Sequence, residues 1–148
     1  EMLREIFARC RKSGVRVYVD PNTQRPVSEY RGATLLTPNR REAEALSGVR
    51  SSKWAEAGQE LLRKSRSQEL VLTLGADGMA VFSPERKKPL WIPTAAREVF
   101  DVSGAGDTVV ATLALFDAAG ATLAEAAHAA NLAAGVVVGK RGTAALSQ

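Results

Sequence analysis

Short apolar runs alternate with helical patterns along this chain, and the alternation limits its fold more than any other feature. Residues 15–19, 33–37 and 69–74 are rich in aliphatic and β-branched side chains, and a proline or glycine follows each run. Helical patterns over residues 39–46 and 53–64 separate the second run from the third. Strands that alternate with helices form a mainly parallel sheet. The sequence therefore predicts an α/β fold.

The rest of the sequence predicts further helices, strands and a loop. It predicts a helix over 2–12, a polar loop over 22–32, two short strands over 79–82 and 90–92, and helices over about 105–119 and 122–138. The two short strands are expected to form an antiparallel hairpin at the edge of the sheet. Thr122 and Glu125 have the spacing of a capping box at the start of the last helix.

Composition and charge exclude several classes of function. The 148 residues carry a net charge of +4, and their basic residues are spread in pairs such as Arg40-Arg41. A nucleic-acid site would show a basic stripe interleaved with aromatic residues, so we interpret these pairs as surface charge, of which a minority attracts a nucleotide polyphosphate. The longest uncharged stretch, residues 126–139, is shorter than the roughly 20 apolar residues that span a membrane.

The amino-terminal segment and the cysteine count suggest a cytoplasmic protein. Residues 1–12 are charged, unlike a secretory signal, and the single Cys10 excludes an internal disulfide. We expect Trp54 and Trp91 to be packing residues and Cys10 to be a buried small apolar side chain. Because the chain opens in a helix with no strand before it, we expect it to be the C-terminal part of a longer protein.

The stretch from Asp101 to Asp107, Asp-Val-Ser-Gly-Ala-Gly-Asp, is the most informative motif. Gly104, Ala105 and Gly106 leave their backbone N–H groups accessible at the start of a helix, where unpaired donors and the helix dipole favour an anion. Asp107 adds a carboxylate, which suggests phosphoryl transfer to a hydroxyl group. A tight turn into a helix explains the same residues about as well. The motif matches neither a Walker loop nor the dinucleotide fingerprint.

Two further motifs follow predicted strands. In Thr37-Pro-Asn39-Arg-Arg-Glu42, Asn39 and Glu42 fit a capping box, and they also fit a polar pair at the sheet edge where α/β proteins bind ligands. The two interpretations are compatible. In Thr73-Leu-Gly75-Ala-Asp-Gly78, the glycines fit a turn into the hairpin or a backbone surface that touches a nucleotide.

Taken in this order, the motifs resemble the ribokinase-like (PfkB) family of carbohydrate kinases over nearly the whole chain. The resemblance implies a three-layer sheet with helices on both faces, and makes residues 1–148 the C-terminal, ATP-binding portion of such a kinase. The segments 30–39, 93–108 and 134–143 resemble the heptose-7-phosphate kinase branch. That branch transfers the ATP γ-phosphate to the anomeric hydroxyl of D-glycero-β-D-manno-heptose 7-phosphate, a step toward lipopolysaccharide.

The resemblance also assigns roles to residues. Asp107 corresponds to the catalytic base, and Gly104, Ala105 and Gly106 correspond to the anion hole. Residues that correspond to the nucleotide and Mg²⁺ sites form a second group: Asn39, Glu42, Thr73, Gly75, Gly78 and Asn131. Within this group, Asn39 and Glu42 correspond to the pair that holds Mg²⁺ through water. Asp101 and Ser103 lie where many members bind a monovalent cation such as K⁺. The resemblance implies that ATP and a phosphorylated sugar are the partners. It is also compatible with a homodimer of the full-length protein.

Three alternatives remain at this stage. The chain could be a nucleotide-binding fragment without activity, because the sugar-binding half of such kinases is absent from it. It could belong to a PfkB kinase for another sugar. A nucleotide-cofactor oxidoreductase is disfavoured by the missing dinucleotide fingerprint.

Overall fold

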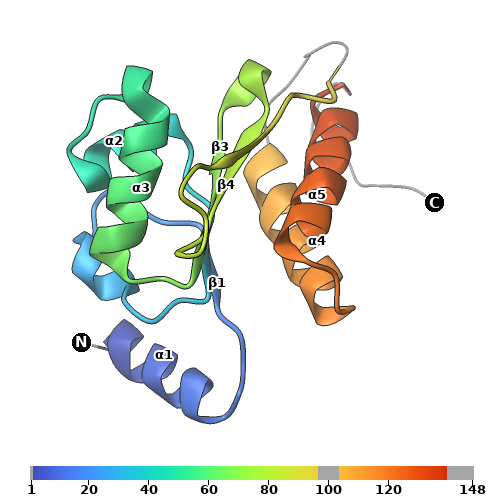
Figure 1. Cartoon of the computed structure of the whole chain (residues 1–148). Coiled ribbons are helices and arrows are strands. Elements are labelled where there is room, and N and C mark those ends of the chain that lie inside the picture. Colours follow the sequence, from blue (N-terminus) through green and yellow to red (C-terminus); the bar gives the residue numbers. More distant parts are fainter. Residues whose placement is uncertain (1, 97–103, 140–148) are drawn as a thin grey trace.

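The computed structural model describes residues 2–96 and 104–139, which form a five-stranded sheet between two pairs of helices (Figure 1). The strands lie side by side in the order of the sequence: β1 (Tyr18–Val19), β2 (Leu35–Leu36), β3 (Glu69–Thr73), β4 (Met79–Phe82) and β5 (Leu90–Ile92). β1, β2 and β3 are parallel, whereas β4 and β5 run antiparallel to their neighbours. The predicted α/β fold and its antiparallel edge hairpin are therefore confirmed.

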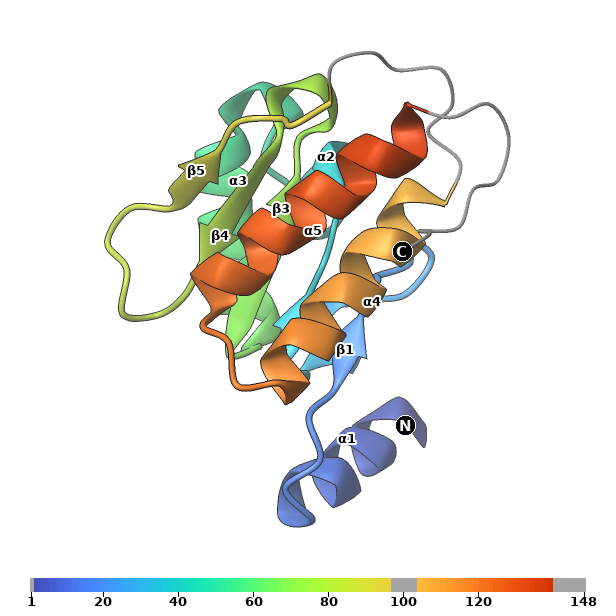
Figure 2. The same ribbon diagram turned by 90° about the vertical axis from the view of Figure 1, so that its right-hand side faces the viewer.

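The helices cover both faces of the sheet, as Figures 1 and 2 show. One face carries α2 (Arg40–Ser47) and α3 (Trp54–Ser65), and the other carries α4 (Ala105–Ala118) and α5 (Leu123–Val138), which pack against each other in opposite directions. α1 (Met2–Lys12) lies apart from these layers, beside the 3-10 helix η1 (Val27–Tyr30). None of the described helices is long and apolar enough to cross a membrane.

Alternation along β3 explains why the sheet has helices on both sides. Leu70 and Leu72 are buried in the core beneath α3, where Leu61 is also buried. Val71, between them in sequence, is buried in the second core with Leu113 of α4. Because successive side chains of a strand point to opposite faces, a continuous apolar strand needs cover on both.

The parallel strands are shorter than predicted because side chains and loops replace part of the ladder. The sequence predicted strands over 15–19 and 33–37, but β1 and β2 pair over two residues each. At the edge of this pairing the Thr34 hydroxyl accepts the backbone N–H of Val17 at 2.9 Å. The helices agree with the prediction to within two residues at either end, and α1 begins and ends at the predicted residues.

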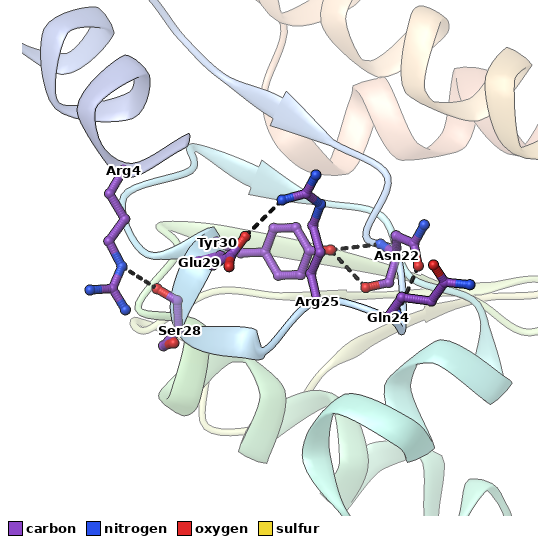
Figure 3. Close-up of polar contacts among 7 residues, drawn as sticks. All are labelled: Arg4, Asn22, Gln24, Arg25, Ser28, Glu29 and Tyr30. Carbon is purple, nitrogen blue, oxygen red and sulfur yellow. Dashed lines mark hydrogen bonds and ion pairs between the residues drawn. The ribbon is translucent and has the colours of Figure 1, made fainter. Parts of the chain in front are cut away.

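The loop after β1 is more ordered than a polar loop suggests, because it contains η1 and a buried tyrosine (Figure 3). The Tyr30 hydroxyl accepts the backbone N–H of Asn22 and donates to the carbonyl of Asn22, each at 2.8 Å. Arg4 of α1 donates to the carbonyl of Ser28 at 3.2 Å, which links α1 to this loop. The loop is thereby held at the carboxyl end of β1.

Two packing predictions were wrong. Trp91 is 54% exposed, because it lies on the outer strand β5 with its side chain away from the core, where its Nε1 donates to the carbonyl of Asp77 at 2.9 Å. Cys10 is half-buried in α1, where Phe7 is the buried residue. α1 packs against little besides η1, so most of its apolar side chains keep contact with solvent.

A network of polar side chains lies at the amino end of the parallel strands. The Tyr18 hydroxyl donates to the carboxylate of Asp117, in the last turn of α4, and Arg16 forms ion pairs with Asp117 and Glu69. Partial burial raises the pKa of Tyr18, and its hydrogen bond to Asp117 raises it further. This network joins β1, β3 and α4.

Candidate functional site

A cavity of about 950 Å³ opens at the carboxyl end of the parallel strands. The start of α2, the turn between β3 and β4, the start of α4 and the last turns of α5 contribute to its wall. Several residues predicted from the motifs line it: Asn39, Thr73, Gly75, Gly78, Ala105, Gly106 and Asn131. Tertiary structure thus gathers, around one space, residues that are far apart in the sequence.

The start of α2 confirms the predicted capping box. The Asn39 side chain accepts the N–H of Glu42 at 3.0 Å, and the Glu42 carboxylate accepts the N–H of Asn39 at 2.7 Å. Asn39 also pairs with Thr73 in an isolated parallel bridge, in which Thr73 donates its N–H to the carbonyl of Pro38 at 2.9 Å. Asn39 lines the cavity, whereas Glu42 lies behind it in the first turn and is half-buried.

Two glycines shape the turn between β3 and β4, each for a different reason. Gly75 has a φ of 65° and no atom near the position of a side chain, so its backbone is open to the cavity. Gly78 has a φ of 92°, and a Cβ there would lie 2.6 Å from the carbonyl carbon of Pro93. Only glycine allows the chain after β5 to pass this close to the turn.

The start of α4 presents backbone rather than side chains to the cavity. Gly104 precedes the helix with a φ of 77°, and its carbonyl accepts the N–H and the hydroxyl of Thr108 at 3.0 and 2.9 Å. The first N–H groups of a helix have no partner within it, and Ala105 and Gly106, in the first turn of α4, line the cavity.

Asp107 is exposed in the first turn of α4, next to the lining residues rather than among them. The predicted cation ligands Asp101 and Ser103 lie outside the described residues.

Carboxylates collect on the side of the cavity where β1 ends. A methyl group on Gly106 would lie 3.8 Å from the Asp20 carboxylate, so the two residues are neighbours. Although Asp20 keeps contact with solvent, partial burial raises its pKa, and the negative charges of Glu42 and Asp107 raise it further. A cation would relieve this repulsion.

These acids do not form a preformed metal cage. Among residues 2–96 and 104–139, no three His, Cys, Asp or Glu side chains are arranged to hold an ion. Mg²⁺ fits such a site, because it retains several waters and binds through one or two carboxylates together with substrate phosphates.

Asn131 forms part of the opposite wall. It is buried in α5, and its Nδ2 donates to the carbonyl of Pro93 at 2.7 Å. Nearby, a Cβ on Gly135 would lie 3.1 Å from the backbone nitrogen of Ala96, so the helix and the segment after β5 are in close contact. The Asn131 amide therefore holds this wall in place.

The structure adds lining residues to which the motifs gave no role, among them Arg40, Arg41, Ala76, Thr94 and Gly135. From the sequence, the basic pairs, Arg40-Arg41 among them, were interpreted as surface charge, of which a minority attracts a nucleotide polyphosphate. The position of the arginine pair between Asn39 and Glu42, in the first turn of a helix that begins at the sheet edge, was the signal that could have placed it at the cavity.

Comparison with known proteins gives a consistent result. The family model described as pfkB family carbohydrate kinase matches residues 1–148. The chain is 45% identical to the bifunctional protein HldE of Desulfatibacillum aliphaticivorans and 46% identical to that of Geobacter sulfurreducens, in each case over 99% of this chain and 30% of the relative. The chain therefore spans about a third of the length of these relatives.

A solved structure, Arabidopsis thaliana ribokinase complexed with ribose and ATP, aligns with 96% of this chain and 47% of the ribokinase at a TM-score of 0.84 and 25% identity. The fold described above is thus ribokinase-like.

Proposed function

The chain belongs to the pfkB family of carbohydrate kinases, and we propose that its cavity is the ATP-binding side of a sugar kinase. The observation that carries this proposal is the gathering of the family motifs around one space of about 950 Å³ at the carboxyl end of the parallel strands. Ligands of α/β proteins bind at this edge of the sheet. The similarity to a ribokinase complexed with ATP supports the choice of nucleotide.

The phosphate chain would lie against the start of α4. Gly104, Ala105 and Gly106, at the start of α4, would offer backbone N–H donors to the transferring phosphoryl group. Gly75 would bring the β3–β4 turn close to the nucleotide, because it has no side chain to intervene. Asn131 would close the pocket on the side of the base.

Asp107 would act as the base. It is exposed in the first turn of α4, one residue after the proposed anion hole, so an acceptor hydroxyl can approach its carboxylate and the phosphoryl group together. In a loose phosphoryl transfer the proton leaves the hydroxyl late, so orientation by Asp107 matters as much as its basicity. The carboxylate takes the proton as the new P–O bond forms and ADP departs.

Asn39 and Glu42 would hold Mg²⁺ through water, and Asp20 lies on the same side of the cavity. When bound with ATP, the ion would neutralise charge on the β- and γ-phosphate oxygens. Asp101 and Ser103 remain a predicted monovalent cation site, for K⁺ by the family resemblance.

For the sugar, we propose the anomeric hydroxyl of D-glycero-β-D-manno-heptose 7-phosphate, with the 1,7-bisphosphate as product. The support is the identity of 45–46% to proteins named HldE, together with the segments 30–39, 93–108 and 134–143 that resemble the heptose-7-phosphate kinase branch. A role in lipopolysaccharide synthesis, a cytoplasmic location and a homodimeric assembly remain predictions.

The test is a phosphotransfer assay on the full-length protein with Mg-ATP and a panel of acceptors: the heptose 7-phosphate, fructose 6-phosphate and ribose. We expect turnover with the heptose phosphate to exceed that with the other two, and ³¹P NMR to show a phosphate on the anomeric oxygen. Preference for another sugar would support the proposed kinase activity but refute the heptose phosphate as its substrate. ATP binding without turnover on any sugar would favour a nucleotide-binding protein without kinase activity.

A further inference from the structure

Arg40 occupies an unusual position in the cavity wall. It is the first residue of α2, and its Nη2 forms an ion pair with the carboxylate of Asp77 in the turn between β3 and β4. The pair thus connects two elements that both line the cavity. Arg40 is two-thirds buried, whereas Asp77 is mostly exposed.

The Nε–H donor of Arg40 has no hydrogen-bond partner among the described residues. Its Nε is buried and, among the described residues, is the one buried side-chain nitrogen or oxygen without a hydrogen-bond partner. Buried polar groups without partners are rare, because each gives up its hydrogen bonds to water. Because Arg40 lines the cavity and keeps a third of its side chain exposed, a small shift of this side chain would bring the donor to an acceptor on a bound ligand.

The charge of the wall indicates what kind of acceptor. Among the described lining residues, Arg40 and Arg41 are the charged side chains, and none is a carboxylate. The negative charges of Glu42 and Asp107 act on Asp20, yet none of these three acids lines the cavity. An anion inside the cavity therefore meets positive charge.

Asp77 is well placed to orient the guanidinium. Its backbone is fixed in η3 (Gly75–Asp77), its carbonyl accepts the Trp91 side chain at 2.9 Å, and its carboxylate holds one edge of Arg40. The planar guanidinium has five N–H donors in fixed directions, so fixing one edge also fixes where the others point.

We propose that Arg40, oriented by Asp77, binds a phosphate oxygen of the nucleotide. This inference rests on the nucleotide site proposed above and adds a phosphate-binding residue to it. A guanidinium–phosphate hydrogen bond is charge-assisted and stronger than one to a neutral acceptor such as a base or a ribose hydroxyl. The interaction would also give the buried Nε its missing partner.

Calorimetric titration of the full-length protein with ATP, ADP and adenosine tests the proposal. Arg40→Met removes the donors but keeps much of the side-chain volume, and should weaken ATP and ADP binding about tenfold or more, the loss expected for a charge-assisted contact. Adenosine affinity should stay within about twofold, since adenosine has no phosphate. Arg40→Lys restores the charge without the Nε donor and should recover part of the loss.

Asp77→Asn should weaken ATP binding less than Arg40→Met, because it removes only the group that orients Arg40. The matched control is Arg63→Met, since Arg63 also pairs with an acid, Glu60, but lies outside the cavity lining. Thermal unfolding of each variant reports whether the fold is retained.

The outcomes separate the two proposals. No ATP binding by the wild-type protein would contradict the nucleotide site itself. Equal ATP affinity of the wild type and Arg40→Met would overturn only the role of Arg40. An equal loss for ATP and adenosine would show a contact to the nucleoside or a general structural effect, and would also overturn it.

Discussion

The two ends of the sheet use similar residues for opposite purposes. At the amino end, Asp117 in the last turn of α4 is held by Tyr18 and Arg16, so its carboxylate serves the fold. At the carboxyl end, Asp107 in the first turn of the same helix is exposed beside the cavity. The two residues are ten positions apart, or about 15 Å along the helix.

The same contrast holds for the two capping boxes. Asn39 and Glu42 begin α2 at the cavity, and Thr122 and Glu125 begin α5 at the other end of the sheet. The local hydrogen bonding is the same, but Asn39 of the first pair lines the cavity, whereas Thr122 and Glu125 do not. Polar groups that the protein satisfies internally stabilise it, whereas those left open are available to a ligand.

The largest expected effect tests this contrast directly. Asp107→Asn should lower turnover of the full-length protein by about 10²–10⁴-fold, the contribution of a general base, while ATP affinity and stability change little. Asp117→Asn should leave turnover per folded molecule near normal and lower the free energy of unfolding by about 1–2 kcal/mol, since Arg16 is half-exposed and screened. Steady-state kinetics and chemical denaturation measure the two variants, and near-normal turnover of Asp107→Asn would refute the proposed base.

The two ends of the sheet also differ in how their glycine turns are packed, as Gly78 at the cavity and Gly120 at the other end show. Gly78→Ala should cost roughly 2–5 kcal/mol, because the new Cβ combines an unfavourable φ with a clash against the chain after β5. Gly120→Ala, in the turn between α4 and α5, has a φ of 87° but no atom within 4 Å of the new Cβ, and should cost about 1 kcal/mol. Equal losses on urea denaturation would mean that contact with Pro93 does not constrain the nucleotide turn.

The caps should separate stability from binding. Asn39→Ala and Thr122→Ala should each lower the free energy of unfolding by about 1 kcal/mol, the usual value of a helix cap. Only Asn39→Ala should also weaken Mg-ATP binding, because only that cap lies at the cavity. Calorimetry on both variants measures this difference, and equal Mg-ATP affinities would place Asn39 outside the nucleotide site.

The smallest effect concerns pH at the amino end. Hydrogen bonds from the side chain and then the backbone of Thr122 lower the pKa of Glu125 below its ordinary 4.5. Because the folded-state pKa is depressed, the stabilisation is present above pH 4.5 and is lost as pH falls through the folded-state value. Thr122→Ala should raise the pKa of Glu125 toward 4.5 in an NMR titration. Glu44, whose pKa is lowered by Ser51, is the internal control and should not move.

Features encoded within a few residues were predicted well. Both capping boxes, the stop of α2 at Gly48 and the glycine turn after β3 follow from local hydrogen bonds and backbone sterics. The lengths of β1 and β2 were overestimated because strand length depends on the partner strand. The exposure of Trp91 was missed because an apolar residue on an outer strand can point to either side.

The sequence by itself determined the element order, the α/β class and the family, since these follow from periodicity, turn residues and motif spacing. Tertiary structure decided which of these motifs meet. It placed Arg40 and Arg41 at the cavity instead of on an unrelated surface, and it set Arg40 against Asp77, a residue 37 positions away. The physical reason is that parallel strands bring their carboxyl ends to one edge of the sheet, where residues that local rules cannot connect surround the same space.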